Sequence, residues 1–332
     1  MGGVKKLTGV KLSERVIPVP RSISPEAQAG LSAAVERGPM LGKIPALQDV
    51  AGWHAMIAKM NAASVAMLGP LTAAMKGRVE ARSMGGVTVY VAEPDAIPEK
   101  NADKALLFFH GGGLVLNGGE PSKHVTLIQA MRMRCKVFGV DFRNPPEHPY
   151  PAALDDCVAV YRELLETYKP SQIVMAGSSG GGNLAGAVPL KARDLGLPLP
   201  SAVGMFSPEV DLTESGDTFH TNRDVDVVLV GGLMPLNQLY AGGADLAHPY
   251  LSPLFGDFTK GFPATYLQSG TRDVLLSNTV RFHRALRKAG VEADLHVWEA
   301  MPHVAFGGAP EDVEPAQEFS RFLTKVAGWA LP

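Results

Sequence analysis

The stretch Ile173-Val174-Met175-Ala176-Gly177-Ser178-Ser179-Gly180-Gly181 places a short apolar run directly before a turn of glycine and serine. The turn fits the pattern G-x-S-x-G, and Asn183-Leu184-Ala185-Gly186 follows as the start of a helix. A turn this sharp needs small flanking residues, and it exposes the central serine at the carboxyl edge of a sheet. We therefore predict that Ser179 is a nucleophile. The alternative is a glycine-rich turn that binds phosphate or merely connects two elements.

A second glycine-rich loop lies upstream. His110-Gly111-Gly112-Gly113 follows the apolar run Ala105–Phe109. Three glycines let the backbone approach a substrate closely and turn N–H groups toward a developing oxyanion. The N–H of Gly180, at the start of the helix after Ser179, can point to the same oxygen. We predict an oxyanion hole here, with His110 organising the loop; a flexible turn is the alternative.

An aspartate and a histidine follow the ends of two later apolar runs. Asp273 comes after Thr265–Gln268, and His303 comes after Asp294–Trp298. In such a set His303 would take the Ser179 proton, and Asp273 would fix the histidine tautomer and stabilise the imidazolium. The chain order Ser, Asp, His is the order found in α/β-hydrolases. We therefore predict a catalytic triad, rather than a solvated loop aspartate and histidine.

Other candidate ligands lack a recognised pattern. Asp211, Asp224 and Asp226 lie in a region rich in Asp, Gly and Pro, where we expect hydrated surface carboxylates. The sequence contains no H-E-x-x-H, cysteine cluster or EF-hand spacing, so we expect no metal. No P-loop or G-x-G-x-x-G turn follows a predicted strand, so we expect no nucleotide cofactor.

Composition excludes several classes of protein. A net charge of −2 over 332 residues gives no basic footprint for nucleic acid. No apolar run approaches the roughly 18 residues of a membrane helix, and the first residues lack the apolar region of a signal peptide. We expect a cytoplasmic protein without membrane insertion. Cys135 and Cys157 are the only cysteines, and we expect both to be reduced.

Short apolar runs alternate with amphipathic segments from Gly85 onward. This alternation predicts an α/β fold, with a mainly parallel central sheet flanked by helices. The predicted strands are Val87–Ala92, Ala105–Phe109, Val137–Asp141, Ile173–Ala176, Ala202–Phe206, Thr265–Gln268 and Asp294–Trp298.

Two regions depart from this alternation. Residues 1–80 show helical stretches without strands, and residues 209–250 show one helix-like piece near Leu233–Tyr240. We expect both to form a helical cap over the carboxyl edge of the sheet, where open α/β sheets bind ligands. The catalytic unit is then residues 81–208 together with 251–332.

The motifs resemble those of the bacterial hormone-sensitive-lipase-like esterases, a branch of the α/β-hydrolases, over roughly residues 83–325. The segment from Asp141 to Ala153, DFRNPPEHPYPAA, is similar to that family's Y-R-x-x-P-E-H-P-F-P-A-A segment. The resemblance implies the α/β-hydrolase fold and places Ser179, Asp273 and His303 on the triad positions. It also implies that the backbone N–H groups of Gly112, Gly113 and Gly180 bind the oxyanion.

Several residues differ from the family pattern. The family usually has Asp or Thr at position 178 and Ala at 180, whereas this chain has Ser178 and Gly180. Val274 replaces a usual proline, and Leu114 stands where an aromatic residue often follows the glycines. Val304 and Ala305 replace the glycine that commonly follows the histidine, which would reshape the acyl pocket.

These observations predict a cofactor-free serine carboxylic-ester hydrolase, a carboxylesterase, that acts on short to medium acyl esters. A lactone hydrolase or a deacetylase or amidase with the same triad is the alternative, and a non-catalytic small-ligand receptor is a remote one. Family members often dimerise through the last strand, so the resemblance also implies a homodimer. We predict that the substrate pocket is lined by Leu114, Trp53, Met56, Met234 and Val304.

Overall fold

The computed structural model describes residues 9–10, 13–14 and 16–330. Its centre is a sheet in the order β1-β2-β4-β3-β5-β6-β7-β8, in which β1 and β2 are antiparallel to their neighbours and the rest pair in parallel. The predicted α/β-hydrolase fold with a mainly parallel sheet is therefore confirmed. The strands are β1 Gly77–Met84, β2 Val87–Pro94, β3 Ala105–Phe109, β4 Lys136–Val140, β5 Ile173–Ser178, β6 Ala202–Phe206, β7 Ala264–Gly270 and β8 Ala293–Trp298.

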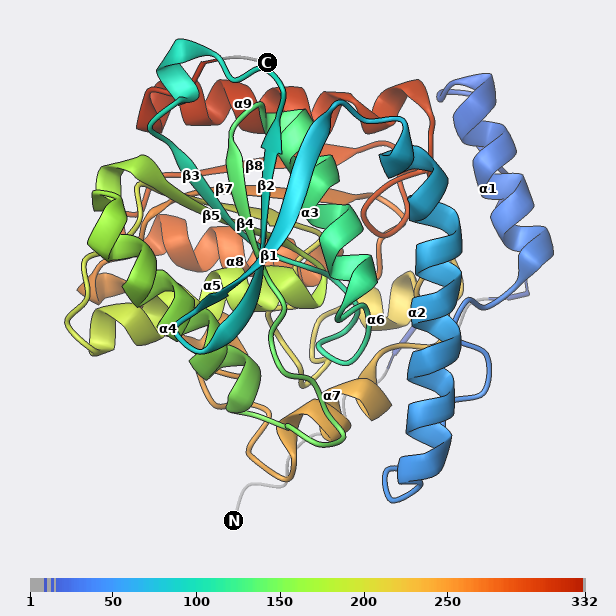
Figure 1. The fold of residues 1–332 in the computed structure, drawn as a ribbon. Coiled ribbons are helices and arrows are strands. Elements are labelled where there is room, and N and C mark those ends of the chain that lie inside the picture. Colours follow the sequence, from blue (N-terminus) through green and yellow to red (C-terminus); the bar gives the residue numbers. More distant parts are fainter. Residues whose placement is uncertain (1–8, 11–12, 15, 331–332) are drawn as a thin grey trace.

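Helices cover both faces of this sheet (Figure 1). The α-helices are α1 Pro25–Arg37, α2 Val50–Ala73, α3 Glu120–Met133, α4 Ala152–Thr167, α5 Gly180–Asp194, α6 Thr218–Thr221, α7 Met234–Ala241, α8 Leu276–Lys288 and α9 Glu314–Ala327. Short 3₁₀ helices are η1 Glu99–Asn101, η2 Pro170–Gln172, η3 Pro253–Phe255, η4 Phe258–Lys260 and η5 Pro310–Asp312. No helix in the described ranges is long and apolar enough to cross a membrane.

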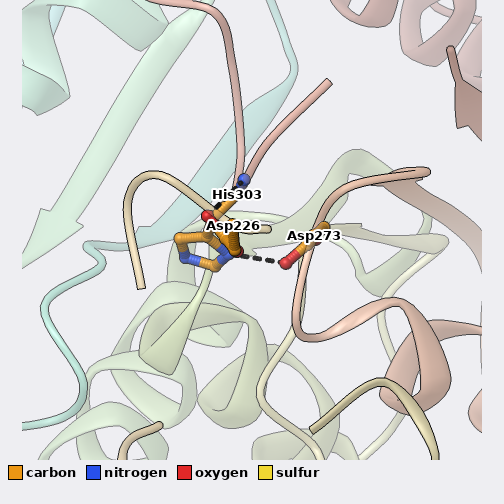
Figure 2. Close-up of side chains that lie close together, drawn as sticks. All are labelled: Asp226, Asp273 and His303. Carbon is orange, nitrogen blue, oxygen red and sulfur yellow. Dashed lines mark hydrogen bonds and ion pairs between the residues drawn. The ribbon is translucent and has the colours of Figure 1, made fainter. Parts of the chain in front are cut away.

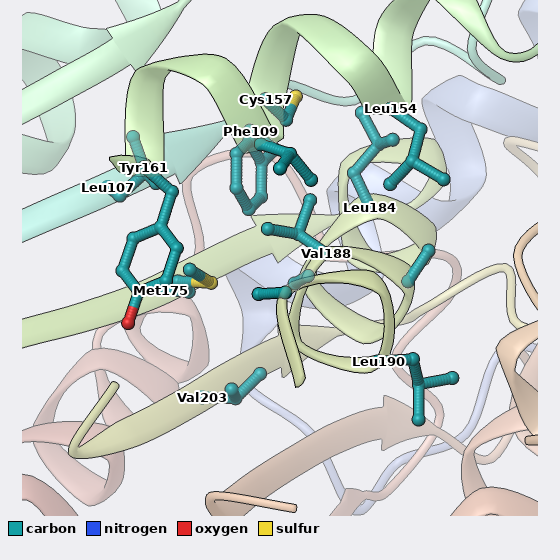
Figure 3. Packing of buried hydrophobic residues seen from close by; sticks show 14 of the residues in the cluster. Leu107, Phe109, Leu154, Cys157, Tyr161, Met175, Leu184, Val188, Leu190 and Val203 are labelled. Atoms are coloured by element: carbon teal, nitrogen blue, oxygen red, sulfur yellow. The ribbon is translucent and has the colours of Figure 1, made fainter. Parts of the chain in front are cut away.

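The larger hydrophobic core lies between the sheet and the helices α4, α5 and α8, which cover one of its faces. Leu107 and Phe109 of β3 pack there with Leu184 and Val188 of α5 and with Tyr161 of α4, as Figure 3 shows. All five side chains are fully buried. Because β3 and β5 are covered on both faces, they read as continuous apolar runs rather than as alternating patterns.

The opposite face of the sheet carries a second core beneath α3 and α9. Phe108 of β3 points to this side and packs in one cluster with Met133 of α3 and Phe319 of α9. Gly204 of β6 lies under this helix: a Cβ added to Gly204 would lie 2.5 Å from the Phe319 ring. The absence of a side chain at this position therefore allows α9 to sit close to the sheet.

The N-terminal region and the insertion share a third cluster. Trp53 and Met56 of α2 pack with Leu236 of α7, Phe219 of α6 and Leu116 of the glycine-rich loop. The division of the chain into a cap and a catalytic unit rests on this packing and stays our proposal.

One strand was not expected from the sequence. We predicted only helices within residues 1–80, but β1 begins at Gly77 and pairs antiparallel with β2. Most of its side chains are exposed. An exposed, polar edge strand buries no alternating apolar face, so periodicity alone could not reveal it.

Candidate active site

Ser179 occupies the turn between β5 and α5 with φ 56° and ψ −124°. This is a left-handed conformation that non-glycine residues rarely adopt, and such strain is typical of functional turns. The Ser179 N–H donates to the carbonyl of Phe206 at 2.9 Å, which ties the turn to β6. A Cβ on Gly177 would lie 2.1 Å from the carbonyl oxygen of Gly181, so only glycine allows the turn to close.

The glycine-rich loop lies directly against this turn. Gly112 has φ 126° and Gly113 has φ 57°, so two of the three glycines adopt positive φ. A Cβ added to Gly180 would lie 2.6 Å from the backbone nitrogen of Leu114 and 3.1 Å from that of Gly113. The glycine-rich loop, with the backbone nitrogen of Gly113 among its nearest atoms, therefore lies close to Gly180 in the Ser179 turn.

The ring of His110 supports the glycine-rich loop. Its ring stacks on Phe142, with the ring centroids 4.2 Å apart, and its Nδ1 lies 2.9 Å from the carbonyl oxygen of Gly111. Burial lowers the pKa of His110. A neutral, stacked imidazole inside the protein suits a structural part of the loop better than a proton carrier.

His303 and Asp273 form a buried pair at the same edge of the sheet. Nδ1 of His303 lies 3.1 Å from Oδ1 of Asp273, and Figure 2 shows the ring turned toward this carboxylate. A carboxylate can only accept, so Nδ1 carries the proton and Nε2 is left to act as a base. The Ser179 hydroxyl makes no hydrogen bond in the described part of the chain. Hydrogen bonds between a catalytic serine and its base often form fully only when substrate binds.

The Asp273 carboxylate is surrounded by donors. Besides His303, it accepts from the Ser269 hydroxyl at 2.7 Å and from the Leu275 N–H at 2.9 Å. Burial acts to raise the pKa of Asp273, but the charge and hydrogen bond of His303, with hydrogen bonds from Ser207 and Ser269, hold that pKa below its ordinary value. Asp273 is therefore ionised at neutral pH.

The charge of Asp273 acts back on the histidine. Burial acts to lower the pKa of His303, but the charge and hydrogen bond of Asp273, followed by the charge of Asp226, raise that pKa above its ordinary value. An imidazolium that is stabilised in this way is what a general base needs when it accepts a proton during a reaction.

Two of our expectations about the insertion were wrong. We expected Asp211 and Asp226 to be hydrated surface carboxylates, but both are fully buried; only Asp224 is exposed. Asp211 accepts from Arg281 at 2.6 Å, and Asp226 accepts the backbone N–H groups of Val274 and His303. Residues flanked by polar neighbours can still turn inward when donors elsewhere in the fold compensate for the loss of water.

A cavity of about 580 Å³ reaches the chain neighbours of Ser179 and His303, although Ser179, Asp273 and His303 do not themselves line it. Ser178 and Val304, the neighbours of Ser179 and His303, are part of its wall. Of the predicted pocket residues, Val304 lines this cavity, whereas Trp53, Met56, Leu114 and Met234 do not. Helix α2 contributes other side chains that the sequence analysis missed, among them Met67, Leu68 and Leu71.

One group in the described chain has the residue types of a metal site. The side-chain ligand atoms of Asp226, Asp273 and His303 lie within 4.8 Å of one another. However, Nδ1 of His303 is paired with Asp273, and both Asp226 oxygens accept backbone N–H groups. The atoms that face one another are thus already hydrogen-bonded, and this arrangement suits proton transfer better than metal binding.

Comparison with known proteins shows which family the chain matches. A family model described as the alpha/beta hydrolase fold matches residues 106–307. An acetyl-hydrolase of Streptomyces hygroscopicus is 34% identical over 209 residues, 62% of this chain and 70% of that protein. An esterase of Acinetobacter venetianus is 30% identical over 211 residues, 61% of this chain and 68% of that protein.

Solved structures agree with these relatives. One esterase structure is similar with a TM-score of 0.89 and 34% identity, covering 96% of this chain and 99% of that one. A second structure, of an esterase from the bacterial hormone-sensitive lipase family, has a TM-score of 0.76 and 31% identity and covers 92% and 100%. The resemblance inferred from the motifs is confirmed, and the chain belongs to the bacterial hormone-sensitive lipase family of α/β-hydrolases.

Proposed function

We propose that this protein is a serine carboxylic-ester hydrolase that acts on short to medium acyl esters. The observation that carries the proposal is the meeting of three elements at one sheet edge. Ser179 lies on a strained turn, the glycine-rich loop rests against Gly180, and the His303–Asp273 pair is buried nearby. Relatives named as esterases and acetyl-hydrolases support the same reaction.

The proposed reaction has two steps. The Ser179 Oγ attacks the ester carbonyl while its proton passes to Nε2 of His303, and the resulting oxyanion accepts hydrogen bonds from Gly112, Gly113 and Gly180. His303 then protonates the leaving alcohol, which leaves an acyl-enzyme. In the second step His303 takes a proton from water, the hydroxide attacks the acyl carbonyl, and the Ser179 oxygen leaves with that proton.

The cavity beside Ser178 and Val304 is our proposed site for the acyl group. Its walls are mainly apolar, and a volume of about 580 Å³ falls in the range of small-molecule sites. Met67 and Leu71 of α2 are themselves more than half exposed, so chain length would be set at the open side of this cavity.

A lactone or acetyl-amide substrate would pass through the same tetrahedral intermediate, so it stays the alternative. The name acetyl-hydrolase carried by the Streptomyces relative favours a small acyl group in either case. The homodimer and the cytoplasmic location stay predictions from the sequence.

The test compares Ser179→Ala with the wild type on p-nitrophenyl esters of increasing acyl length. A triad serine supplies most of the rate, so we expect the variant to lose about 10⁴-fold or more in kcat. Ser32→Ala is the matched control, since Ser32 is exposed on α1 and bonds only within its helix. A Ser179→Ala variant with substantial turnover would refute the proposal, and a matching lactone and anilide test the alternative.

A further inference from the structure

Asp226, in the insertion of residues 209–250, touches both loops that carry the His303–Asp273 pair. Its Oδ2 accepts the N–H of Val274 at 2.9 Å, and its Oδ1 accepts the N–H of His303 at 3.4 Å. The Asp226 carboxylate thus bridges Val274, the residue after Asp273, and the backbone of His303. These loops follow β7 and β8 and are otherwise separate segments of the chain.

Asp226 is also bound within its own segment. Oδ1 accepts the N–H of Val228 at 2.9 Å and that of Leu229 at 3.3 Å. Four backbone N–H groups therefore converge on a side chain that is 0% exposed. Donors in this number act to lower the pKa of Asp226 and offset part of its removal from water, although burial and then the charge of Asp273 raise that pKa above its ordinary value. A neutral side chain of the same shape could not accept from all four.

A second carboxylate lies near the His303 ring. Oxygens of Asp226 and Asp273 and a ring nitrogen of His303 lie within 4.8 Å of one another. Figure 2 shows these three side chains close together. The charged groups that act on His303 are Asp273, from the loop after β7, and Asp226, from the insertion. Like charges this close repel, and this repulsion by Asp273 contributes to the raised pKa of Asp226, whereas the charge of His303 acts to lower it.

We infer that Asp226 is a positioning residue of the triad: it holds the Asp273 and His303 loops in register with the insertion and adds a second negative charge that stabilises the His303 imidazolium. This inference rests on the proposed function. It assigns a catalytic consequence to a residue of the insertion that the triad motifs do not include.

The test uses Asp226→Asn, which keeps the shape but removes the charge and one acceptor. Asp224→Asn is the matched control, because Asp224 is exposed and only two residues away. For each protein, kcat and KM are measured on one p-nitrophenyl ester, together with the pH dependence of kcat/KM and the melting temperature. Labelling of Ser179 by a fluorophosphonate counts the active sites, so that rates refer to folded enzyme.

We expect Asp226→Asn to lower kcat per labelled site by about tenfold or more with little change in KM, because misplacing a base costs rate rather than binding. Catalysis needs neutral His303, and the loss of a neighbouring negative charge favours that neutral form. The acid limb of kcat/KM should therefore move to lower pH, whereas Asp224→Asn should match the wild type. A purely structural residue would lower the melting temperature and leave the acid limb in place.

Three results separate the hypotheses. If wild-type Ser179 is not labelled and esters are not hydrolysed, the proposed function fails. If the wild type is active but Asp226→Asn keeps its kcat and acid limb, only the inference about Asp226 fails. If Asp226→Asn does not fold, Asp226→Ser and Asp226→Glu replace it: the neutral serine should move the acid limb and the charged glutamate should not, and equal limbs would overturn the inference.

Discussion

Substitution of Asp273 by asparagine should be less harmful here than in many triads, because of how the carboxylate is bound. Oδ1 of Asp273 accepts from both His303 and the fixed N–H of Leu275, while Oδ2 accepts from the Ser269 hydroxyl. An asparagine must place its oxygen toward Leu275, since its NH₂ group would face another donor there. The NH₂ group then meets Ser269, whose hydroxyl can rotate to accept.

In this orientation the asparagine oxygen still accepts from His303, so the tautomer with a proton on Nδ1 is kept. What is lost is the negative charge beside the imidazolium. At about 4 Å and an effective dielectric constant of about 20, that interaction amounts to roughly 4 kcal/mol. This corresponds to a loss of about 10³-fold in kcat. Where the same change forces the wrong histidine tautomer, the loss is about 10⁴-fold.

The assay is kcat for one p-nitrophenyl ester, referred to fluorophosphonate-labelled Ser179, for the wild type, Asp273→Asn and Asp273→Ala. Alanine removes both the charge and the acceptor, so we expect Asp273→Ala to be the slower variant. If Asp273→Asn proved as slow as Asp273→Ala, the reasoning about Leu275 and Ser269 would be refuted. Wild-type rates in both would show that Asp273 is not the triad acid.

Two further predictions follow from buried contacts. Burial and then the charge of Glu214 raise the pKa of Glu209 from 4.5 to about 8, so the folded state holds an extra proton between these pH values. The free energy of unfolding should therefore fall as pH rises through that window, by up to about 1.4 kcal/mol per pH unit. Glu209→Gln should remove this pH dependence, which denaturant unfolding at a series of pH values would measure. The Cβ of Gly180→Ala would lie 2.6 Å from the Leu114 nitrogen, well inside the 3.4 Å at which ordinary contact begins, so the loop must move. We expect Gly180→Ala to lower kcat about 10²-fold. Gly69→Ala should leave kcat unchanged, because its added Cβ would lie 4.0 Å from the nearest atom, and equal kcat values for the two variants would contradict the prediction.

The sequence was sufficient to predict the strands that matter for the site. Ala105–Phe109 and Ala202–Phe206 were predicted with the bounds that the structure shows, because strands covered on both faces are continuous apolar runs. The turn at Ser179 was predictable for a related reason. Its glycines are required by close backbone contacts, and a requirement for the absence of a side chain leaves a clear pattern in sequence.

The burial of Asp226 could not be predicted in this way. Its distant partners are backbone N–H groups of Val274 and His303, 48 and 77 positions away, and any residue type except proline can supply such a donor. The cavity wall was missed for a similar reason. Met67 and Leu71 look like ordinary surface residues of α2, and only the path of that helix past the sheet edge brings them to the cavity. Contacts that depend on tertiary position leave no local signal.

The buried acids near the site differ in the donors that surround them and in the direction in which their pKa values shift: the pKa of Asp273 is lowered, whereas burial raises the pKa values of Asp226 and Glu209. Asp226 accepts four backbone N–H groups and Asp273 accepts from His303, Ser269 and Leu275, whereas neither carboxyl oxygen of Glu209 has a partner in the described ranges. All three are fully buried, so burial cannot distinguish them. The two acids with donors face His303, where negative charge stabilises an imidazolium. Glu209 hydrogen-bonds through its backbone N–H to the Ser179 carbonyl, and its raised pKa favours a neutral side chain in this part of the fold. On the proposed mechanism, the acids that carry donors lie beside the predicted base, and the acid without hydrogen-bonded carboxyl oxygens follows the nucleophile turn.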